Sequence, residues 1–222
     1  MILSDLFNLM EPVDMKQEEV MKDYVPERKA VDEEALDLVF ILDKSGSMGG
    51  LEEDTIGGFN SMLAKQREEQ KKTNCKAYVT TVLFNSEVNI IHKSVPIEKV
   101  APMTSKEYRV GGCTALLDAM GDAITFMDRL KSEQGKALVV VITDGYENSS
   151  RRYKKDEIKK LVEAHKKQGW DFVFMGADLS AVDEARDYGF DQENTIFYKN
   201  DSRGIAKNFE MCCCIAKDLM HK

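Results

Sequence analysis

An apolar run at residues 38–42 ends directly in the polar segment 43–47, which reads DKSGS. Apolar residues without polar alternation are typical of a strand that is buried on both faces, as in parallel sheets covered by helices. A second apolar run, at 137–142, ends in Thr143 and Asp144. Because the carboxyl ends of parallel strands share one edge of a sheet, the two segments predict an open α/β fold with polar loops at that edge.

The remaining sequence alternates between strand-like and helix-like patterns. Strands are predicted where apolar, β-branched and aromatic residues cluster, and helices where apolar residues recur every three or four positions. The predicted strands are 36–42, 77–84, 88–91, 137–142, 171–175 and 195–198, and the predicted helices are 51–67, 114–130, 154–168, 181–188 and 202–220. A short turn at 85–87 joins two strands into a hairpin. We therefore predict a doubly wound, mostly parallel central sheet with one antiparallel edge hairpin and helices on both faces.

The first part of the chain differs from the rest. Residues 1–35 hold short apolar clusters separated by acidic residues, and we expect an N-terminal arm and linker there, with one domain over 36–222. The arm is either a loosely docked extension or a helix that binds a partner or a second copy. The second interpretation depends on apolar residues at helical spacing, namely Leu3, Leu6, Phe7 and Met10.

Charge and cysteine content limit the partners and the compartment. The formal net charge is −8 and basic residues are scattered, which argues against a nucleic-acid surface. No apolar run approaches the ~20 residues of a membrane helix, and the first ten residues lack the pattern of a signal peptide. The chain has five cysteines and no Cys-x-x-Cys spacing, so we expect a reducing, cytoplasmic location. The sequence does not indicate an oligomeric state.

Oxygen-bearing side chains come from three separate segments of the sequence. Asp43, Ser45 and Ser47 follow the first buried strand, Thr114 precedes a predicted helix, and Asp144 follows the second buried strand. Together they offer three hydroxyls and two carboxylates, without thiolate or imidazole. Oxygen ligands select Mg²⁺, Mn²⁺ or Ca²⁺ over Zn²⁺ or Cu²⁺, and a site that keeps several waters favours Mg²⁺.

The same three segments resemble the metal-ion-dependent adhesion site (MIDAS) of the von Willebrand factor type A (vWA) domain family. The family pattern is Asp-x-Ser-x-Ser, then a separate Thr, then a separate Asp, and the resemblance covers roughly residues 36–200. It implies that the hydroxyls of Ser45, Ser47 and Thr114 bind the ion, and that Asp43 and Asp144 act mainly through waters. It also implies a protein-binding module, not an enzyme, in which a partner's Asp or Glu side chain completes the metal coordination.

Other functions compete with this interpretation. The metal could only stabilise the loops of a structural subunit, or it could assist a phosphatase or hydrolase. Asp43 stands where haloacid-dehalogenase-type phosphatases place their nucleophile, but those enzymes need a second acid at the position of Ser45. In some vWA relatives the last helix, here 202–220, moves when the metal gains its ligand, and that possibility stays open.

Several side chains near and away from the site have two readings. Lys44, Met48, Tyr146 and Glu147 flank the site, either as rim residues that shape partner choice or as exposed loop residues. The three histidines are far apart in the sequence and we expect them to be solvated. The cysteines 212–214 are consecutive, and because helical residues fan out by about 100° each, we expect core packing there, not a metal site.

Overall fold

The computed structural model describes residues 35–130, 136–177 and 179–221, so the expected arm lies outside the described residues apart from Ala35. Within them, six strands form one sheet in the order β3-β2-β1-β4-β5-β6. The strands are β1 (Leu36–Asp43), β2 (Ala77–Phe84), β3 (Val88–Pro96), β4 (Lys136–Thr143), β5 (Trp170–Gly176) and β6 (Thr195–Phe197). Only the β2–β3 pair is antiparallel in this sheet, which confirms the predicted hairpin at one edge.

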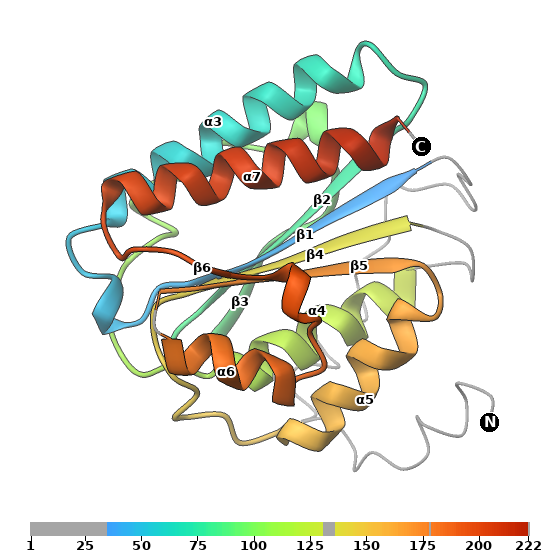
Figure 1. Cartoon of the computed structure of the whole chain (residues 1–222). Helices are drawn as coiled ribbons and strands as arrows, with labels where there is room; N and C mark the ends of the chain where they lie inside the picture. The colour runs from blue at the N-terminus through green and yellow to red at the C-terminus, as the bar shows by residue number, and fades with distance from the viewer. Residues whose placement is uncertain (1–34, 131–135, 178, 222) are drawn as a thin grey trace.

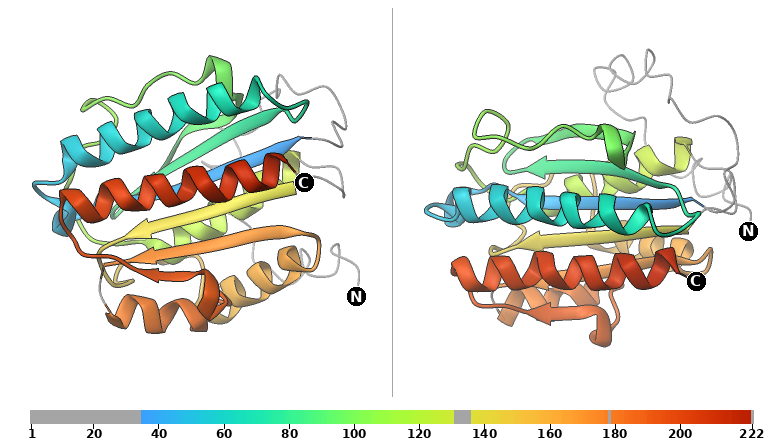
Figure 2. Two further views of the ribbon diagram at one scale, coloured as in Figure 1. Left: turned by 45° about the horizontal axis from the view of Figure 1, so that its top comes forward. Right: turned by 90° about the horizontal axis from the view of Figure 1, so that it is seen from above.

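Helices cover both faces of the sheet, as predicted (Figure 1). On one face lie α3 (Glu52–Gln70) and α7 (Ser202–Met220), which run side by side in all the ribbon views (Figure 2). On the other face lie α4 (Leu116–Leu130), α5 (Lys155–Lys166) and α6 (Leu179–Asp187). Short 3₁₀ turns occur at Gly46–Met48, Ile97–Lys99 and Gln192–Asn194.

The central strand β1 shows why its sequence lacks polar alternation. Phe40 and Leu42 belong to the core under α3 and α7, whereas Val39 and Ile41 belong to the core under α4 and α5. Every residue of β1 is buried, including Asp43 at its end. A strand of this kind has to be apolar at successive positions, because both of its faces pack against helices.

The element boundaries differ from the prediction at β3, which runs to Pro96 where we predicted 88–91, and at the start of α4. We predicted this helix from Thr114, but its first helical residue is Leu116. The Thr114 carbonyl accepts hydrogen bonds from the backbone N–H groups of Asn148 (3.0 Å) and Ser149 (3.3 Å), which belong to a different loop. Thr114 is thereby held outside the helix, in the loop that approaches the sheet edge.

Two of the three histidine expectations are wrong. His165 is fully buried, with its ring nitrogens 2.7 Å from the Leu161 carbonyl oxygen and 2.6 Å from Asp128 Oδ1. His92 is also buried, and its Nδ1 lies 3.0 Å from Thr81 Oγ1. Both rings are buried because a polar partner comes from another element or the preceding helical turn, and spacing along the chain does not reveal such partners.

Of the three consecutive cysteines, the structure places one in the core. Cys212 is buried, Cys213 is half-buried and Cys214 is exposed. This fan around α7 confirms that the three thiols cannot face one ion, and it corrects the expectation of core packing for Cys214.

Two adjacent glycines in the interior of α3 predict opposite effects on stability. A Cβ at Gly58 would overlap the ring of Phe209 in α7, which is 2% exposed and packs edge-on against Phe59. A Cβ at Gly57 would meet nothing within 4 Å. We expect Gly57→Ala to raise the free energy of unfolding by about 1 kcal/mol, because alanine is the better helix former. Gly58→Ala should lower it by about 1–3 kcal/mol through overpacking.

Urea unfolding of the two variants beside the unmodified protein measures the difference. The close approach of α3 and α7 at Gly58 would be contradicted if both alanines stabilised the protein equally.

Candidate metal site

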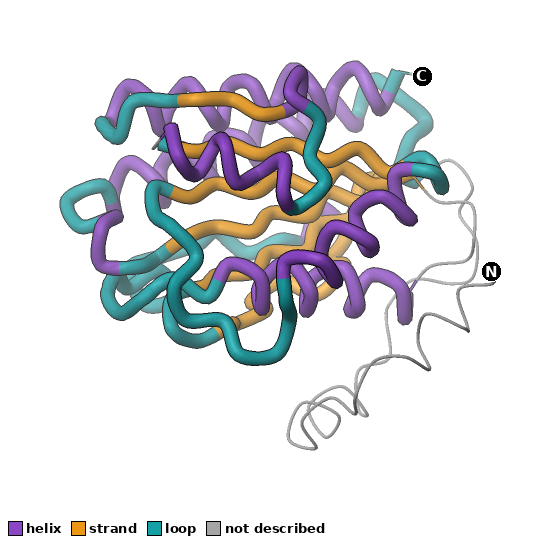
Figure 3. Tube along the Cα trace, turned by 60° about the horizontal axis from the view of Figure 1, so that its bottom comes forward, coloured by secondary structure: helices purple, strands orange, loops and turns teal. Residues whose placement is uncertain are grey.

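The two carboxylates of the predicted site meet at one edge of the sheet. β1 and β4 are neighbours with Leu42 paired to Ile142, so Asp43 ends one strand where Asp144 directly follows the other. The arrows of β4 and β5 end at this edge in Figure 2, and loops gather there in Figure 3. The adjacency of the two strands, which the sequence leaves open, is what brings the carboxylates together.

The two serines link one carboxylate to the other. The backbone N–H of Ser45 donates to Asp43 Oδ1 at 2.7 Å, which curls the loop back onto the strand end. Ser45 Oγ lies 3.1 Å from Ser47 Oγ, and Ser47 Oγ donates to Asp144 Oδ1 at 2.6 Å. Ser45 is buried, while Ser47 is exposed on the outer side of the same turn. The four side chains therefore form one continuous polar row.

Thr114 reaches the same place from the third loop. Its segment is joined to the first loop by two backbone hydrogen bonds, from Gly46 N–H to the Gly112 carbonyl (3.1 Å) and from Gly111 N–H to the Lys44 carbonyl (2.9 Å). Gly112 has φ +82°, and a Cβ there would lie 2.8 Å from Ser86 Oγ in the turn between β2 and β3, so this position favours glycine.

The position beside Gly145 shows that the hydroxyls converge. A Cβ on this glycine would lie 3.3 Å from Thr114 Oγ1 and 3.4 Å from Ser47 Oγ. Both hydroxyls therefore lie close to Gly145, the residue that follows Asp144. The structure thus brings together all five predicted site residues from their three segments.

The electrostatics of this cluster call for a cation. Asp43 is 1% exposed, and its burial raises the pKa of its carboxyl to about 6, although hydrogen bonds from Thr143 and Ser45 oppose the shift. The negative charge of Asp144 raises this pKa further. Among the described residues, neither carboxylate forms an ion pair with a lysine or an arginine. A buried negative charge without a positively charged partner is costly, and a bound cation would offset that cost.

The donor set fits a hard divalent cation. Hydroxyl and carboxylate oxygens are ligands for Mg²⁺, Mn²⁺ and Ca²⁺. The described part of the chain contains no group of three or more His, Cys, Asp or Glu side chains placed to hold a metal. The proposed site does not form such a group, because only two of its five donors are carboxylates and the other three are hydroxyls.

Several neighbours of the site were not found from the sequence. The Thr143 hydroxyl donates to Asp43 Oδ2 at 2.6 Å, and the buried Tyr108 hydroxyl donates to the Asp43 carbonyl oxygen at 2.5 Å. Asn200 Nδ2 donates to Asp144 Oδ2 at 2.7 Å. Thr143 was detectable because it adjoins Asp144. Tyr108 and Asn200 come from loops without a pattern, so only the fold identifies them.

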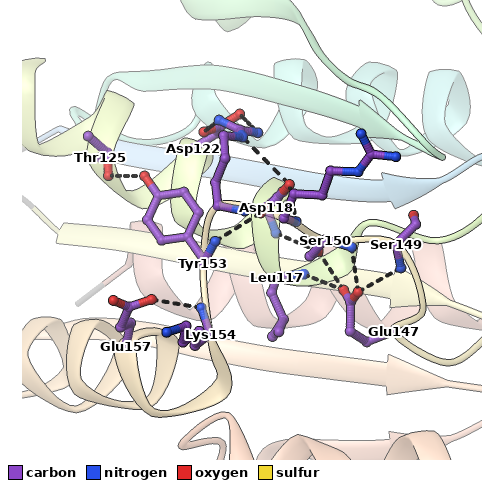
Figure 4. Close-up of polar contacts among 12 residues, drawn as sticks. Leu117, Asp118, Asp122, Thr125, Glu147, Ser149, Ser150, Tyr153, Lys154 and Glu157 are labelled. Carbon is purple, nitrogen blue, oxygen red and sulfur yellow. Dashed lines mark hydrogen bonds and ion pairs between the residues drawn. The ribbon is translucent and has the colours of Figure 1, made fainter. Parts of the chain in front are cut away.

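The four flanking residues do not all fit the two interpretations offered above, rim residues or exposed loop residues. Met48 is fully buried in the core, so it is not a rim residue. Tyr146 is 44% exposed, as a rim or loop residue would be, and Lys44 is half-buried. Glu147 is half-buried and accepts hydrogen bonds from Leu117 at the start of α4 and from Ser149 in its own loop, as Figure 4 shows.

The buried charge of Asp43 predicts an unusual stability effect. With chelator present at pH 7.5, we expect Asp43→Asn to melt at a higher temperature than the unmodified protein. The pKa rise from 3.8 to about 6 corresponds to roughly 2–3 kcal/mol as an upper bound. Because the folded protein takes up this proton at a higher pH than the unfolded chain, the unmodified protein gains stability as pH falls. The difference in melting temperature between Asp43→Asn and the unmodified protein should therefore shrink from pH 7 to pH 4 and vanish below about pH 4.

Thermal melts across this pH range, all in chelator, are the measurement. An asparagine variant that is less stable at pH 7.5 would mean that the charge of Asp43 is compensated within the metal-free protein.

Comparison with known proteins agrees with the observed fold. Residues 37–210 match the von Willebrand factor type A domain, and no curated protein sequence matches the chain. The pilus adhesin SpaC of Lactobacillus rhamnosus GG, in an open conformation, has a similar structure, with TM-score 0.65 and 11% identity over 86% of this chain and 31% of SpaC. The vWF domain of the type V pili tip protein Mfa5 of Porphyromonas gingivalis gives 0.60 and 10% over 85% and 97%.

A third similar structure contains a metal. It is the proximal thread matrix protein 1 of the mussel byssus with a zinc-occupied MIDAS motif, with TM-score 0.55 and 17% identity over 82% of this chain. The chain spans only 46% of that protein, and at such identities the likeness shows the fold alone. The family match covers most of the chain, from 37 to 210, and includes all three loops of the site. The chain therefore belongs to the von Willebrand factor type A domain family.

Proposed function

We propose that the chain is a metal-dependent protein-binding domain. In this proposal Asp43, Ser45, Ser47, Thr114 and Asp144 hold Mg²⁺, with Mn²⁺ or Ca²⁺ as possible replacements. The observation that carries the proposal is the convergence of three hydroxyls and two carboxylates at a sheet edge where the charge of Asp43 is buried without a basic partner.

The donor set also suggests what the partner offers. Neutral hydroxyls leave the charge of a bound divalent cation incompletely balanced, so the cation supplies an attachment point for an external oxygen anion. A carboxylate from an Asp or Glu of a partner protein is the ligand that fits. Ser47 and Asp144 lie at the accessible side, since Ser47 is exposed and Asp144 is half-buried. Asp43 and Ser45 are buried and serve as the inner wall.

The surroundings of Asp43 favour binding over catalysis. A phosphatase of the haloacid-dehalogenase type would need an acid two residues after its nucleophile, and that position holds Ser45, which is buried against Ser47. The mussel protein that resembles this chain contains zinc at its MIDAS motif. We nevertheless favour Mg²⁺ here because all five donors are oxygen atoms.

We also propose that the protein acts in the cytoplasm, without nucleic acid or membrane as its partner. All five cysteines are free, and two of them, Cys113 and Cys214, are exposed thiols, which suits a reducing compartment. No helix in the described residues is both long enough and apolar enough to cross a bilayer.

Capture of partners from a cell lysate tests the proposal. The purified protein is incubated with lysate in Mg²⁺ or in EDTA, beside the Ser45→Ala, Ser47→Ala double variant. A protein retained only by the unmodified chain in Mg²⁺ is the expected result. Equal retention in every sample would contradict the adhesion mechanism and assign binding to another surface, such as the expected arm at 1–35 or a helix face. The metal would then have a structural role.

A further inference from the structure

The carboxylate of Glu147 joins two of the segments that bear candidate ligands. Its Oε2 accepts a hydrogen bond at 2.9 Å from the N–H of Leu117, three residues after Thr114. Its Oε1 accepts from the N–H groups of Ser149 (2.9 Å) and Ser150 (2.7 Å), on the loop that begins at Asp144. The Ser150 hydroxyl donates to Oε2 at 2.7 Å. One carboxylate therefore ties the start of α4 to the loop after β4 (Figure 4).

The turn that Glu147 closes holds Thr114 directly. The side-chain oxygen of Asn148 accepts from Thr114 N–H at 2.9 Å, and Asn148 N–H donates to the Thr114 carbonyl oxygen at 3.0 Å. Ser150 Oγ, which donates to Glu147, also accepts from the N–H of Asp118 at 3.0 Å. Glu147 fixes the fold of the turn, and the turn clamps the backbone on both sides of the Thr114 side chain.

The far end of the same loop is held by a separate carboxylate. Asp118 in α4 accepts hydrogen bonds from the N–H groups of Arg151 (3.0 Å), Arg152 (2.9 Å) and Tyr153 (3.0 Å). The loop from Asp144 to Tyr153 is thus bound to α4 at several places along its length. Glu147 lies three residues after Asp144, and it accepts a hydrogen bond from the N–H of Leu117, three residues after Thr114.

We propose that Glu147 is a positioning residue of the metal site. It sets the separation of Thr114 from Asp144, and among the described residues none of its hydrogen bonds goes to the five candidate ligands. This inference rests on the proposed function, because it concerns the geometry of the same site. A charged acceptor suits the place, since the N–H groups at the start of α4 favour negative charge.

Four variants separate positioning from charge and from general stability. Glu147→Gln removes the charge and one of the two acceptor oxygens, whereas Glu147→Asp keeps the charge and shortens the side chain. Glu157→Gln is the matched control, because Glu157 Oε2 accepts the N–H of Lys154 at 2.7 Å at the start of α5. Ser47→Ala removes a candidate ligand. The affinity for Mn²⁺ is measured by titration followed by electron paramagnetic resonance, and urea unfolding is measured in EDTA.

We expect Glu147→Gln and Glu147→Asp each to weaken Mn²⁺ binding by about 10–100-fold, as is usual when a supporting partner of a metal ligand is lost. Glu157→Gln also removes a carboxylate that accepts a backbone N–H at a helix start, but it should change the affinity less than about twofold. Hydrogen exchange at the Thr114 and Leu117 amides should accelerate only in the Glu147 variants.

Three results would contradict the positioning role, and they differ in whether the metal site itself still stands. If the unmodified protein binds Mn²⁺ and Glu147→Gln binds it equally well, the positioning role is overturned while the metal site stands. Unchanged affinity in Glu147→Asp alone would assign the effect to charge and would likewise overturn positioning. If the unmodified protein binds no Mn²⁺, the proposed function fails and this inference fails with it.

Discussion

Replacing Ser45 and Ser47 with alanine together is expected to weaken Mg²⁺ binding by on the order of 100-fold or more. Loss of a mere supporting partner costs 10–100-fold, and this variant removes two direct donors. In EDTA the same variant should lose only about 1–2 kcal/mol of unfolding free energy, for the bonds from Ser47 Oγ to Ser45 Oγ and to Asp144. Isothermal titration calorimetry with Mg²⁺ measures the affinity, and urea unfolding in EDTA measures the free energy of unfolding.

Ser202→Ala is a matched control for this variant. Ser202 Oγ donates to Asp54 Oδ2 at 2.6 Å, the same distance as from Ser47 Oγ to Asp144 Oδ1, but it is not one of the five candidate ligands. Its Mg²⁺ affinity should stay within about twofold of the unmodified protein. An unchanged Mg²⁺ affinity in the double serine variant would mean that the two hydroxyls stabilise the turn and do not coordinate the ion.

Gly121→Ala in α4 is expected to lower the free energy of unfolding by about 2–3 kcal/mol through overpacking. A Cβ there would overlap the ring of Tyr153, with Cγ only 2.5 Å away. That ring is 7% exposed and cannot swing aside, because its hydroxyl lies 3.1 Å from Thr125 Oγ1 and its backbone N–H donates to Asp118. The intrinsic preference of alanine for helices, about 1 kcal/mol, is too small to offset the overlap.

A double-mutant cycle with Tyr153→Ala tests the cause. If the ring is what the new methyl group meets, the double variant is more stable than the sum of the two single effects predicts, by about 1 kcal/mol or more. Additive effects would show that the destabilisation by Gly121→Ala comes from elsewhere in α4.

Most of the fold was predictable because its central strands have a distinct apolar sequence pattern. The runs at 38–42 and 137–142 are apolar at successive positions, and the structure places both at the centre of the sheet, buried by helices on each face. The hairpin of β2 and β3 was predictable from the short turn at 85–87. The order of the strands was not, since no local pattern states that β1 lies between β2 and β4.

The candidate ligands were predictable and their supports were not. Asp43, Ser45 and Ser47 stand close together in the sequence, so their spacing carries information. Tyr108 and Glu147 act through hydrogen bonds to residues 65 and 30 positions away. Such partners are defined only when the loops are brought together. The burial of His165 was missed for the same reason, since Asp128 reaches it from another helix.

The most direct test of the central claim is a crystal structure of the protein soaked in Mn²⁺, with anomalous diffraction recorded at the manganese absorption edge. We expect one strong anomalous peak bordered by the side-chain oxygens of Ser45, Ser47 and Thr114, and no such peak in the Ser45→Ala, Ser47→Ala variant. Absence of a peak at this edge of the sheet at saturating Mn²⁺, or a peak in a different place, would contradict the central claim.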